Sequence, residues 1–228
     1  MPTTTKKNGS PPVFQVSRFA RKVWRRLVSR KLTKSDDYQG LNRLYAMEDP
    51  WEMTSHREQL RFRETNAFIA QCMGRVGSLL ELGCGEGHQS VHLAGLCDRL
   101  VGIDVSERAV NRAQARLPNA KFIVADIAGL TTAAPPFDLV VACEMLYYVK
   151  DIPATLERMN QLGSACLVTF FGPAARVVAP HLASMPVSHR GWIYGDPYEW
   201  LFAFWRTGVR PTLATFDAKS ADVSRSTT

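Results

Sequence analysis

The sequence has no apolar run that approaches the roughly 20 residues needed for a membrane-spanning helix. The sequence also lacks a disulfide or metal-binding pattern of cysteines. Its five cysteines are odd in number, scattered along the chain and without a C-x-x-C pair. This usage indicates reduced, mostly buried thiols and a cytoplasmic location rather than a disulfide framework. The 228 residues, 46% of them hydrophobic, suffice for one sizeable packed domain with short appendages.

Acidic residues are absent from positions 1–34, which hold ten of the 28 Lys and Arg residues of the chain. The remaining residues carry 18 basic against 21 acidic side chains, so the formal net charge of +7 comes from this N-terminal arm. A protein body with a slight negative excess has no general attraction for a phosphate backbone. We therefore expect no nucleic-acid partner.

Residues 1–40 form a separate arm in this interpretation, with a polar start over 1–13 that we expect to be disordered. The segment Val16–Lys31 has the periodicity of an amphipathic helix. Its apolar face comprises Val16, Phe19, Ala20, Val23, Trp24 and Leu27, and its basic face Arg18, Arg21, Lys22, Arg25 and Arg26. Such a helix can lie in the anionic interface at the inner face of a membrane, pack on the domain, or act as an organelle-targeting presequence. The sequence leaves these three open.

The chain also lacks the G-x-G-x-x-G loop that holds a dinucleotide pyrophosphate on a helix N-terminus. Instead, an apolar run leads into Glu81, glycines follow at positions 83, 85 and 87, and the helix-like segment 89–96 comes next. A strand, a glycine turn and a helix in this order bring backbone N–H groups close to a ligand. The Glu81 carboxylate would repel a pyrophosphate but suits a cationic amine.

Apolar and helical segments alternate along the rest of the chain. Further strands are predicted at 100–104, 122–126, 138–143 and 167–171, and helices at 55–73, 106–117 and 151–161. Continuous apolar strands separated by helices are typical of a parallel sheet that is covered on both faces. The predicted fold class is α/β, a Rossmann-like, doubly wound and mostly parallel sheet with an N-terminal helical extension.

The predicted helix 55–73 begins with Ser55 and Glu58, which are spaced as a capping box. The residues expected on its inward face are Leu60, Ala67, Phe68 and Cys72. The preceding segment 36–40 is interpreted as a linker.

Three carboxylates end three successive predicted strands, since Asp104 and Asp126 follow Glu81 by 23 and 45 residues. In open parallel sheets, ligands bind outside the carboxyl ends of the strands. Asp104 can accept both hydroxyls of a ribose, Asp126 the exocyclic amine of adenine, and Glu81 can face a sulfonium and an amino group. The alternative for each acid is a helix N-cap or an exposed turn.

These features resemble the class I S-adenosylmethionine (SAM)-dependent methyltransferases. The matching motifs, over about residues 76–171, are the glycine loop at 79–88, I-D-V-S at 103–106, A-D-I at 125–127 and F-D-L-V-V-A at 137–142. A closer similarity, to the NodS-like enzymes that N-methylate an amino sugar, rests on E-D-P-W at 48–51 and C-E-M-L-Y-Y-V at 143–149. The resemblance implies SAM as the cofactor and a methyltransferase domain over 41–216. The tail 217–228 is polar, and we expect it to be disordered.

In such proteins the position of Asp104 binds the ribose, that of Asp126 the adenine amine, and those of Gly83 and Gly85 the methionine moiety. The expected cofactor-binding set is Glu81, Gly83, Gly85, Gly87, Asp104, Val105, Asp126, Ile127, Cys143 and Trp51. For Trp51, a lid over the cofactor and a hydrophobic anchor ahead of a helix are both open.

Methyl transfer from a sulfonium needs mainly alignment in a dry site, and a base only if the acceptor must lose a proton. Just past the fourth predicted strand, Glu144 and Tyr148 are the candidates for orienting an amine or a hydroxyl. Packing over the cofactor is the alternative for Tyr148 and its neighbour Tyr147. No metal site is expected, because His88 and His92, four residues apart, lack the acid of an H-E-x-x-H site.

Beyond Phe171 the sequence departs from the family pattern. A late strand is expected at 209–216, a short strand at 192–194 and an aromatic helix at 197–206. We expect a small-molecule or glycan acceptor that is methylated on nitrogen or oxygen, and peripheral membrane contact through Val16–Lys31 is open. A catalytically silent SAM-binding protein is the alternative, whereas the glycine spacing disfavours an NAD-dependent oxidoreductase.

Overall fold

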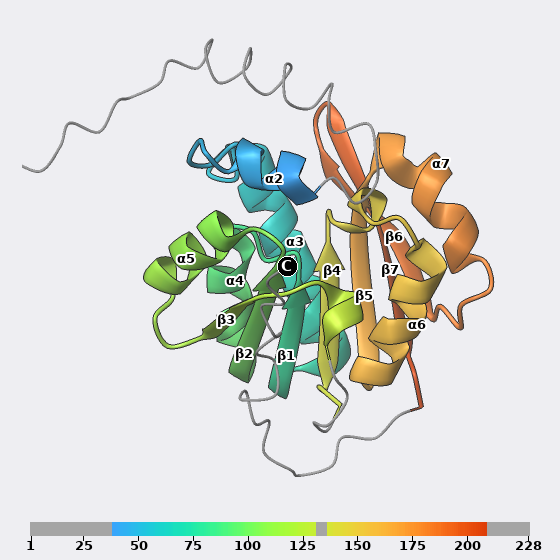
Figure 1. Ribbon diagram of the computed structural model, residues 1–228. Coiled ribbons are helices and arrows are strands. Elements are labelled where there is room, and N and C mark those ends of the chain that lie inside the picture. The colour runs from blue at the N-terminus through green and yellow to red at the C-terminus, as the bar shows by residue number, and fades with distance from the viewer. Residues whose placement is uncertain (1–37, 131–135, 209–228) are drawn as a thin grey trace, which may run out of the picture.

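The computed structural model describes residues 38–130 and 136–208, and its strands form one seven-stranded sheet (Figure 1). The strands are β1 (Val76–Leu82), β2 (Cys97–Asp104), β3 (Lys121–Val124), β4 (Leu139–Cys143), β5 (Ala165–Phe171), β6 (His189–Gly195) and β7 (Tyr198–Arg206). Their order in the sheet is β3-β2-β1-β4-β5-β7-β6. Strands β1 to β5 are parallel, and β7 runs antiparallel to both of its neighbours. The predicted fold class is confirmed.

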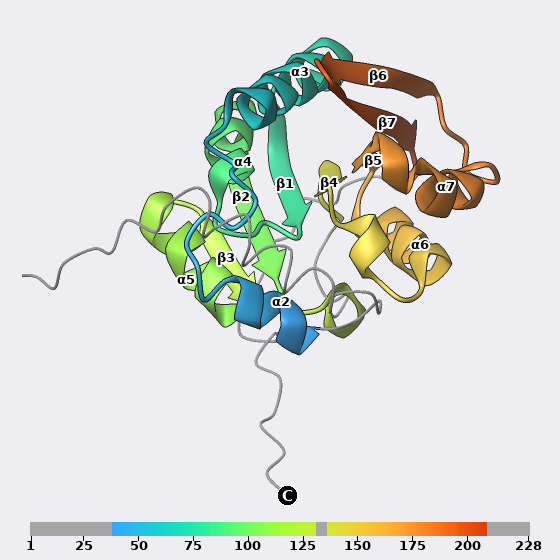
Figure 2. The same cartoon turned by 90° about the horizontal axis from the view of Figure 1, so that it is seen from above.

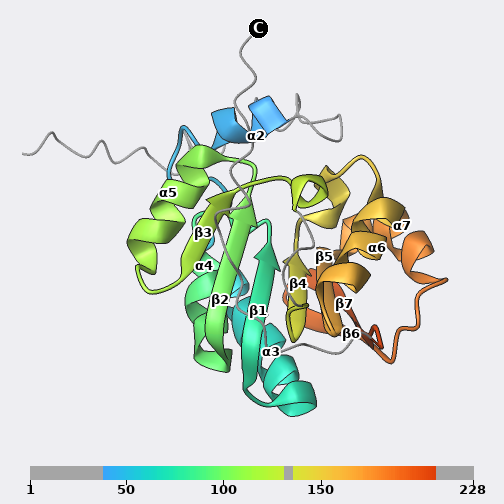
Figure 3. The same cartoon turned by 60° about the horizontal axis from the view of Figure 1, so that its bottom comes forward.

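Strand β1 lies between β2 and β4, and its interior is apolar at consecutive positions. Leu79 pairs with Leu100 on one side and with Leu139 on the other, and all three are buried. Consecutive apolar residues suit a strand whose two faces are both covered. The arrows of β1 and β2 in Figure 3 point toward the edge of the sheet where α2 (Tyr38–Leu44) lies, so the carboxyl ends of these strands meet there.

Helices cover both faces of the sheet, as Figure 2 shows from above. One face carries α3 (His56–Met73), α4 (His88–Leu93) and α5 (Glu107–Arg116); the other carries α6 (Ile152–Leu162) and α7 (Ala175–Val178). The short 3-10 helices are η1 (Ala94–Leu96), η2 (Ile127–Gly129), η3 (Leu146–Tyr148), η4 (Gly172–Ala174) and η5 (Ala179–Leu182). Each face therefore has its own hydrophobic core.

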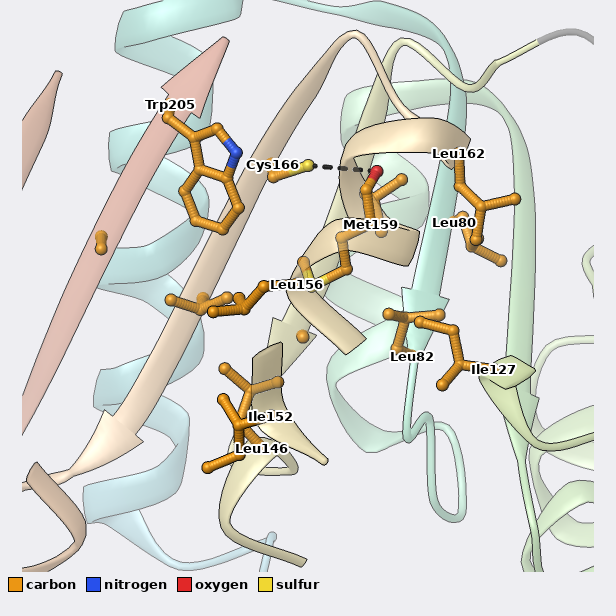
Figure 4. Close-up of a cluster of buried hydrophobic side chains, with 14 of the residues drawn as sticks. Leu80, Leu82, Ile127, Leu146, Ile152, Leu156, Met159, Leu162, Cys166 and Trp205 are labelled. Atoms are coloured by element: carbon orange, nitrogen blue, oxygen red, sulfur yellow. Dashed lines mark hydrogen bonds between the residues drawn. The ribbon is translucent and has the colours of Figure 1, made fainter. Parts of the chain in front are cut away.

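Figure 4 shows the core between the sheet and α6. Met159 and Leu156 of α6 are buried against Leu80 and Leu82 of β1 in one cluster. The fully buried Trp205 closes this core at β7, and its indole N–H donates to Asn160 Oδ1 at 2.8 Å. A buried indole keeps its N–H satisfied in this way, so the ring adds apolar area without an unpaired donor.

The helices predicted at 106–117 and 151–161 both begin with a side-chain cap. The Ser106 hydroxyl accepts from the Ala109 N–H at 3.4 Å, and the Asp151 carboxylate accepts from the Ala154 N–H at 2.9 Å. The capping box at the start of α3 is wrong, because Ser55 makes no side-chain cap hydrogen bond. Its partner residue Glu58 instead pairs with a buried arginine further along the same helix.

The inward face of α3 is partly different from the predicted one. Ala67 is exposed, whereas the buried residues of this helix are Glu58, Arg61, Phe62, Thr65 and Ile69. Hydrophobic periodicity does not predict a buried face that contains two charged side chains, because the burial of these side chains depends on partners elsewhere in the fold. The linker expected at 36–40 is also wrong for its last three residues, which begin α2.

The segment after Phe171 completes the sheet. The aromatic helix predicted at 197–206 is wrong, because Tyr198–Arg206 form strand β7, paired with β5 and β6. The predicted short strand 192–194 is confirmed as part of β6. Aromatic residues at every second position of β7 place rings on one face, and Phe202 and Phe204 pack against Phe68 of α3 at 4.5 and 5.7 Å.

The arm 1–37, the segment 131–135 and the predicted strand 209–216 with its tail lie outside the described residues. The interpretations of Val16–Lys31 remain predictions. Among residues 38–130 and 136–208, no helix is both long and apolar enough to cross a bilayer.

Candidate active site

A cavity of about 470 Å³ opens at the carboxyl ends of β1, β2 and β4. Small-molecule sites occupy about 300–1,000 Å³ and lie at this edge in open parallel sheets. The sequence-predicted residues that line it are Trp51, Glu81, Gly83, Gly85, Asp104, Val105, Asp126, Ile127, Cys143, Glu144 and Tyr148. The structure thus brings together eleven of the twelve residues expected from the sequence, from segments nearly 100 residues apart.

Gly87 is the predicted residue that does not line the cavity. It has φ +77°, and a Cβ atom at this position would lie 3.0 Å from the backbone and side chain of Ala113 in α5. Its role is therefore close packing of the glycine loop against α5, together with the left-handed turn that begins α4.

Asp104 is fixed at the floor of the cavity by two backbone donors. Its Oδ2 accepts from the Gly85 N–H and its Oδ1 from the Ser106 N–H, both at 2.9 Å. Burial raises the pKa of Asp104, and these backbone hydrogen bonds oppose that shift. Since a carboxylate has about four lone-pair sites, each oxygen retains capacity for a ligand hydroxyl.

Gly85 is covered by a residue that the sequence did not single out. Its φ is +53°, and a Cβ atom there would lie 2.9 Å from the hydroxyl oxygen of Tyr45. Burial raises the pKa of Tyr45 well above its ordinary value, the Asp104 carboxylate adds to the shift, and a hydrogen bond with Trp51 opposes it. Tyr45 therefore covers the glycine loop and links it to Trp51.

Asp126 lies two residues past β3, as the N-cap of η2, where its Oδ1 accepts from the Ala128 N–H at 3.3 Å. Its Oδ2 accepts from the Tyr38 hydroxyl of α2 at 2.8 Å. The helix-cap alternative for this acid is thus correct, and the same carboxylate also faces the cavity. Capping and ligand contact are compatible, because they use different lone pairs.

Glu81 is buried at the end of β1 and bonded to the hydroxyl of Ser90 in α4. Burial raises its pKa from 4.5 to about 7, while the Ser90 hydrogen bond and the charge of Arg61 oppose the shift. A positively charged ligand group beside Glu81 would lower this pKa again, because it would favour the ionised form of the carboxylate.

Glu144 follows β4 in a left-handed backbone conformation, with φ +59°. Its Oε1 accepts from the Thr169 hydroxyl at 3.0 Å and its Oε2 from the Tyr147 hydroxyl at 3.1 Å. Burial raises the pKa of Glu144, and the charge of Arg61 and both hydroxyl bonds oppose this. A strained, non-glycine backbone that aims a half-buried carboxylate into a cavity is typical of functional sites.

Arg61 of α3 forms the wall beside these acids and was missed by the sequence interpretation. It is 1% exposed, and its guanidinium donates to Glu58 Oε2 at 2.9 Å and to Gln89 Oε1 at 2.8 Å. Gln89 in turn donates to Cys143 Sγ at 3.3 Å. These contacts connect α3, α4 and β4. Burial raises the pKa of the Cys143 thiol to about 12, so the thiol stays protonated at neutral pH and is a poor nucleophile.

Aromatic rings form the outer walls of the cavity. The Trp51 ring lies 5.9 Å from that of Tyr148, which lies 4.6 Å from Tyr147. Tyr198 of β7 lies 6.0 Å from Phe171 of β5 and also lines the cavity. The hydroxyl bonded to Glu144 belongs to Tyr147, whereas Tyr148 faces Trp51. The segment predicted as an aromatic helix therefore contributes one wall of the site as a strand.

Asp49, Glu86 and His88 offer ligand atoms within 4.8 Å of one another. Protein donors already engage these atoms, since Glu86 Oε2 accepts from the Asp49 N–H at 2.8 Å and Arg116 Nη2 lies 3.2 Å from His88 Nε2. Arg112 also pairs with Glu86. Two guanidinium groups beside the cluster disfavour a cation, so we interpret it as a charge-compensated network.

His92 does not join this cluster. Its ring packs 5.3 Å from that of Phe62 in α3. The two histidines of α4 thus contact different partners and share no site.

Comparison with known proteins gives a consistent result. The family model of nodulation protein S (NodS) matches residues 33–179. The chain is 31% identical over 150 residues to nodulation protein S of Sinorhizobium fredii NGR234, covering 64% of this chain and 67% of that protein. It is 34% identical over 125 residues to the protein of that name from Bradyrhizobium diazoefficiens, covering 53% of this chain and 59% of that one.

Among solved structures, the fold resembles that of the N-methyltransferase NodS from Bradyrhizobium japonicum WM9 in complex with S-adenosyl-L-homocysteine (SAH). The TM-score is 0.65 at 27% sequence identity, covering 74% of this chain and 97% of that chain. A second crystal structure of that enzyme matches with a TM-score of 0.59.

Proposed function

The chain belongs to the NodS family and is a SAM-dependent methyltransferase with a small-molecule acceptor, and we propose that it methylates the nitrogen of an amino sugar beside Glu144. The observation that carries the proposal is the half-buried Glu144 carboxylate, aimed into an aromatic-walled cavity from a left-handed backbone. The similarity to an N-methyltransferase supports the choice of nitrogen.

The cofactor end of the cavity is proposed to lie between the glycine loop and the ends of β2 and β3. Asp104 would accept the ribose hydroxyls with lone pairs that its two backbone donors leave free. Asp126 would accept the adenine amine, and Glu81 would face the cationic methionine end. Gly83 and Gly85 adopt left-handed backbones, and a Cβ at either would meet a neighbouring side chain within 3.0 Å, so glycine is needed to form this loop.

When bound, SAM supplies an electrophilic methyl group on a positively charged sulfur. The protein's task is then to present an acceptor lone pair in line with that methyl and to exclude water. An amine does this only in its neutral form, because an ammonium has no lone pair. Glu144 can accept a hydrogen bond from the amine N–H and so turn the lone pair toward the methyl.

The proton balance also suits Glu144. As the N–C bond forms and the C–S bond breaks, the nitrogen becomes positively charged, and a carboxylate beside it stabilises this charge and can accept a proton from it. Glu144, whose pKa burial raises, can take that proton up, and Thr169 and Tyr147 keep its oxygens in place meanwhile. Tyr148, the other predicted catalytic residue, would pack beside the acceptor with Trp51.

The aromatic walls support a ring-shaped acceptor. Trp51, Tyr148 and Tyr198 present broad, rigid surfaces with polar edges, which suit the alternating apolar and hydroxyl faces of a sugar. The NodS relationship supports an amino sugar in particular.

A pair of acceptors tests the proposal. A short glucosamine oligomer and its fully N-acetylated counterpart are incubated with methyl-labelled SAM, and the products are analysed by mass spectrometry and NMR. We expect methylation on nitrogen of the free amine and no transfer to the acetylated form. Methylation on oxygen, or equal transfer to both oligomers, would contradict the proposal.

A further inference from the structure

We propose that Glu86, in the glycine loop, is a positioning residue that couples this loop to the cover segment, residues 45–54, and through it to Trp51. The inference rests on the proposed cofactor site, because it concerns how that site is closed on its outer side. Glu86 stands between the two glycines Gly85 and Gly87 and is 4% exposed.

The two oxygens of Glu86 hold two different parts of the fold. Oε2 accepts from the Asp49 N–H of the cover segment at 2.8 Å, and Oε1 pairs with Arg112 of α5. His88 Nε2 lies 3.4 Å from Oε2. Although burial alone would raise it, the pKa of Glu86 is lowered by the bonds with His88, Arg112 and Asp49, so the side chain is ionised at neutral pH.

Asp49 transmits this contact to Trp51. Its backbone is left-handed, with φ 48°, and its carboxylate accepts from the Met53 N–H at 2.6 Å and from the Thr54 hydroxyl at 3.0 Å. These bonds close a turn around residues 49–54, so Trp51 is held inside the turn. The Trp51 ring then stands over the cavity, 5.9 Å from Tyr148.

Two arginines of α5 also contact the glycine loop, and one of them contacts the cover segment as well. Arg112 Nη1 donates to the Met47 carbonyl of the cover segment at 3.2 Å, as well as pairing with Glu86. Arg116 Nε donates to the Glu86 carbonyl at 2.8 Å. In Glu86→Gln the amide keeps one acceptor oxygen, so its NH₂ group would face either the Arg112 guanidinium or the Asp49 N–H. One buried donor would then lose its partner, and the contact between the cover segment and the loop would weaken.

A double-mutant cycle on SAH binding tests the coupling, with the dissociation constant measured by calorimetry. We expect Glu86→Gln and Trp51→Phe to weaken SAH binding by about tenfold and about fivefold. If the two residues act through one contact chain, the double variant is no more than about twice as weak as the weaker single variant. Glu64→Gln, in the exposed pair with Arg63 on α3, is the matched control and should bind within about twofold of wild type.

An approximately fiftyfold loss in the double variant, the product of the single effects, would overturn the proposal. Unchanged SAH binding in either single variant would overturn it too. If Glu86→Gln fails to fold, Arg112→Met removes the same contact from its more exposed side and should be equally non-additive with Trp51→Phe. Asp104→Asn distinguishes the cofactor site from the coupling. If SAH binding is unchanged in Asp104→Asn, the proposed cofactor site is refuted. If binding is lost there but the effects of Glu86→Gln and Trp51→Phe are additive, only the coupling is refuted.

Discussion

The Gly85 N–H donates to the Asp104 carboxylate at 2.9 Å, which joins the carboxyl ends of neighbouring strands β1 and β2. The two residues lie 19 positions apart in the sequence. Taken alone, the glycine loop or Asp104 would be a weak indication of a cofactor site. The hydrogen bond between them fixes both in one rigid surface. The cofactor site is therefore largely pre-formed by the sheet.

Replacing Asp104 by Asn tests this surface. The amide keeps one acceptor oxygen and turns its NH₂ group toward a backbone N–H, so a buried donor is left unpaired. The expected cost in SAH binding is about 1.5–3 kcal/mol, roughly 10- to 150-fold in the dissociation constant. Asp98→Asn, at the exposed start of the same strand in a pair with Arg75, is the control and should leave binding unchanged.

Gly85→Ala tests the contact between the glycine loop and Tyr45. The left-handed backbone and the Tyr45 hydroxyl at 2.9 Å both oppose a Cβ atom. We expect a loss of about 1–3 kcal/mol in the free energy of unfolding, measured with urea. Tyr45→Phe in the same chain should recover part of that loss, and a purely additive double variant would show that the hydroxyl contact is unimportant.

The control for this experiment is Gly95→Ala, where nothing lies within 4 Å of the added Cβ. This variant should be as stable as the wild type or slightly more stable, because alanine favours the folded backbone at a compatible position.

Glu81 should make the stability of the ligand-free protein depend on pH. The unfolded chain loses the Glu81 proton near pH 4.5, whereas the folded chain loses it near pH 7. Stability therefore falls as pH rises from about 4.5 to 7 and levels off above that range, by about 3 kcal/mol for a shift of this size. Urea unfolding of wild type and Glu81→Gln at several pH values measures it. A difference between the two proteins that is constant with pH would refute the shift.

The sequence predicted the sheet and the cavity floor well because both depend on local patterns. Glu81, Asp104 and Asp126 follow apolar runs, and parallel strands bring their carboxyl ends to one edge. The walls were less predictable. Arg61 is buried only because Glu58 and Gln89 meet it from two helices, which no periodicity shows.

The misassigned segment after Phe171 did carry a signal. Tyr198, Trp200, Phe202 and Phe204 recur at every second position, which is the period of a strand. Large apolar residues on both faces concealed this period, because Leu201 and Trp205 stand at two of the alternate positions. Glu86 and Tyr45 were missed for a different reason, since each acts through a contact with a segment far away in the sequence.

Glu144 is proposed to act on the acceptor amine and not on the cofactor. The turnover rate of Glu144→Gln with a free-amine glucosamine oligomer, at saturating SAM, distinguishes these two roles. We predict a rate about 10²- to 10⁴-fold below that of the wild type, with SAH binding unchanged within about twofold. A variant that turns over at the wild-type rate would contradict the account.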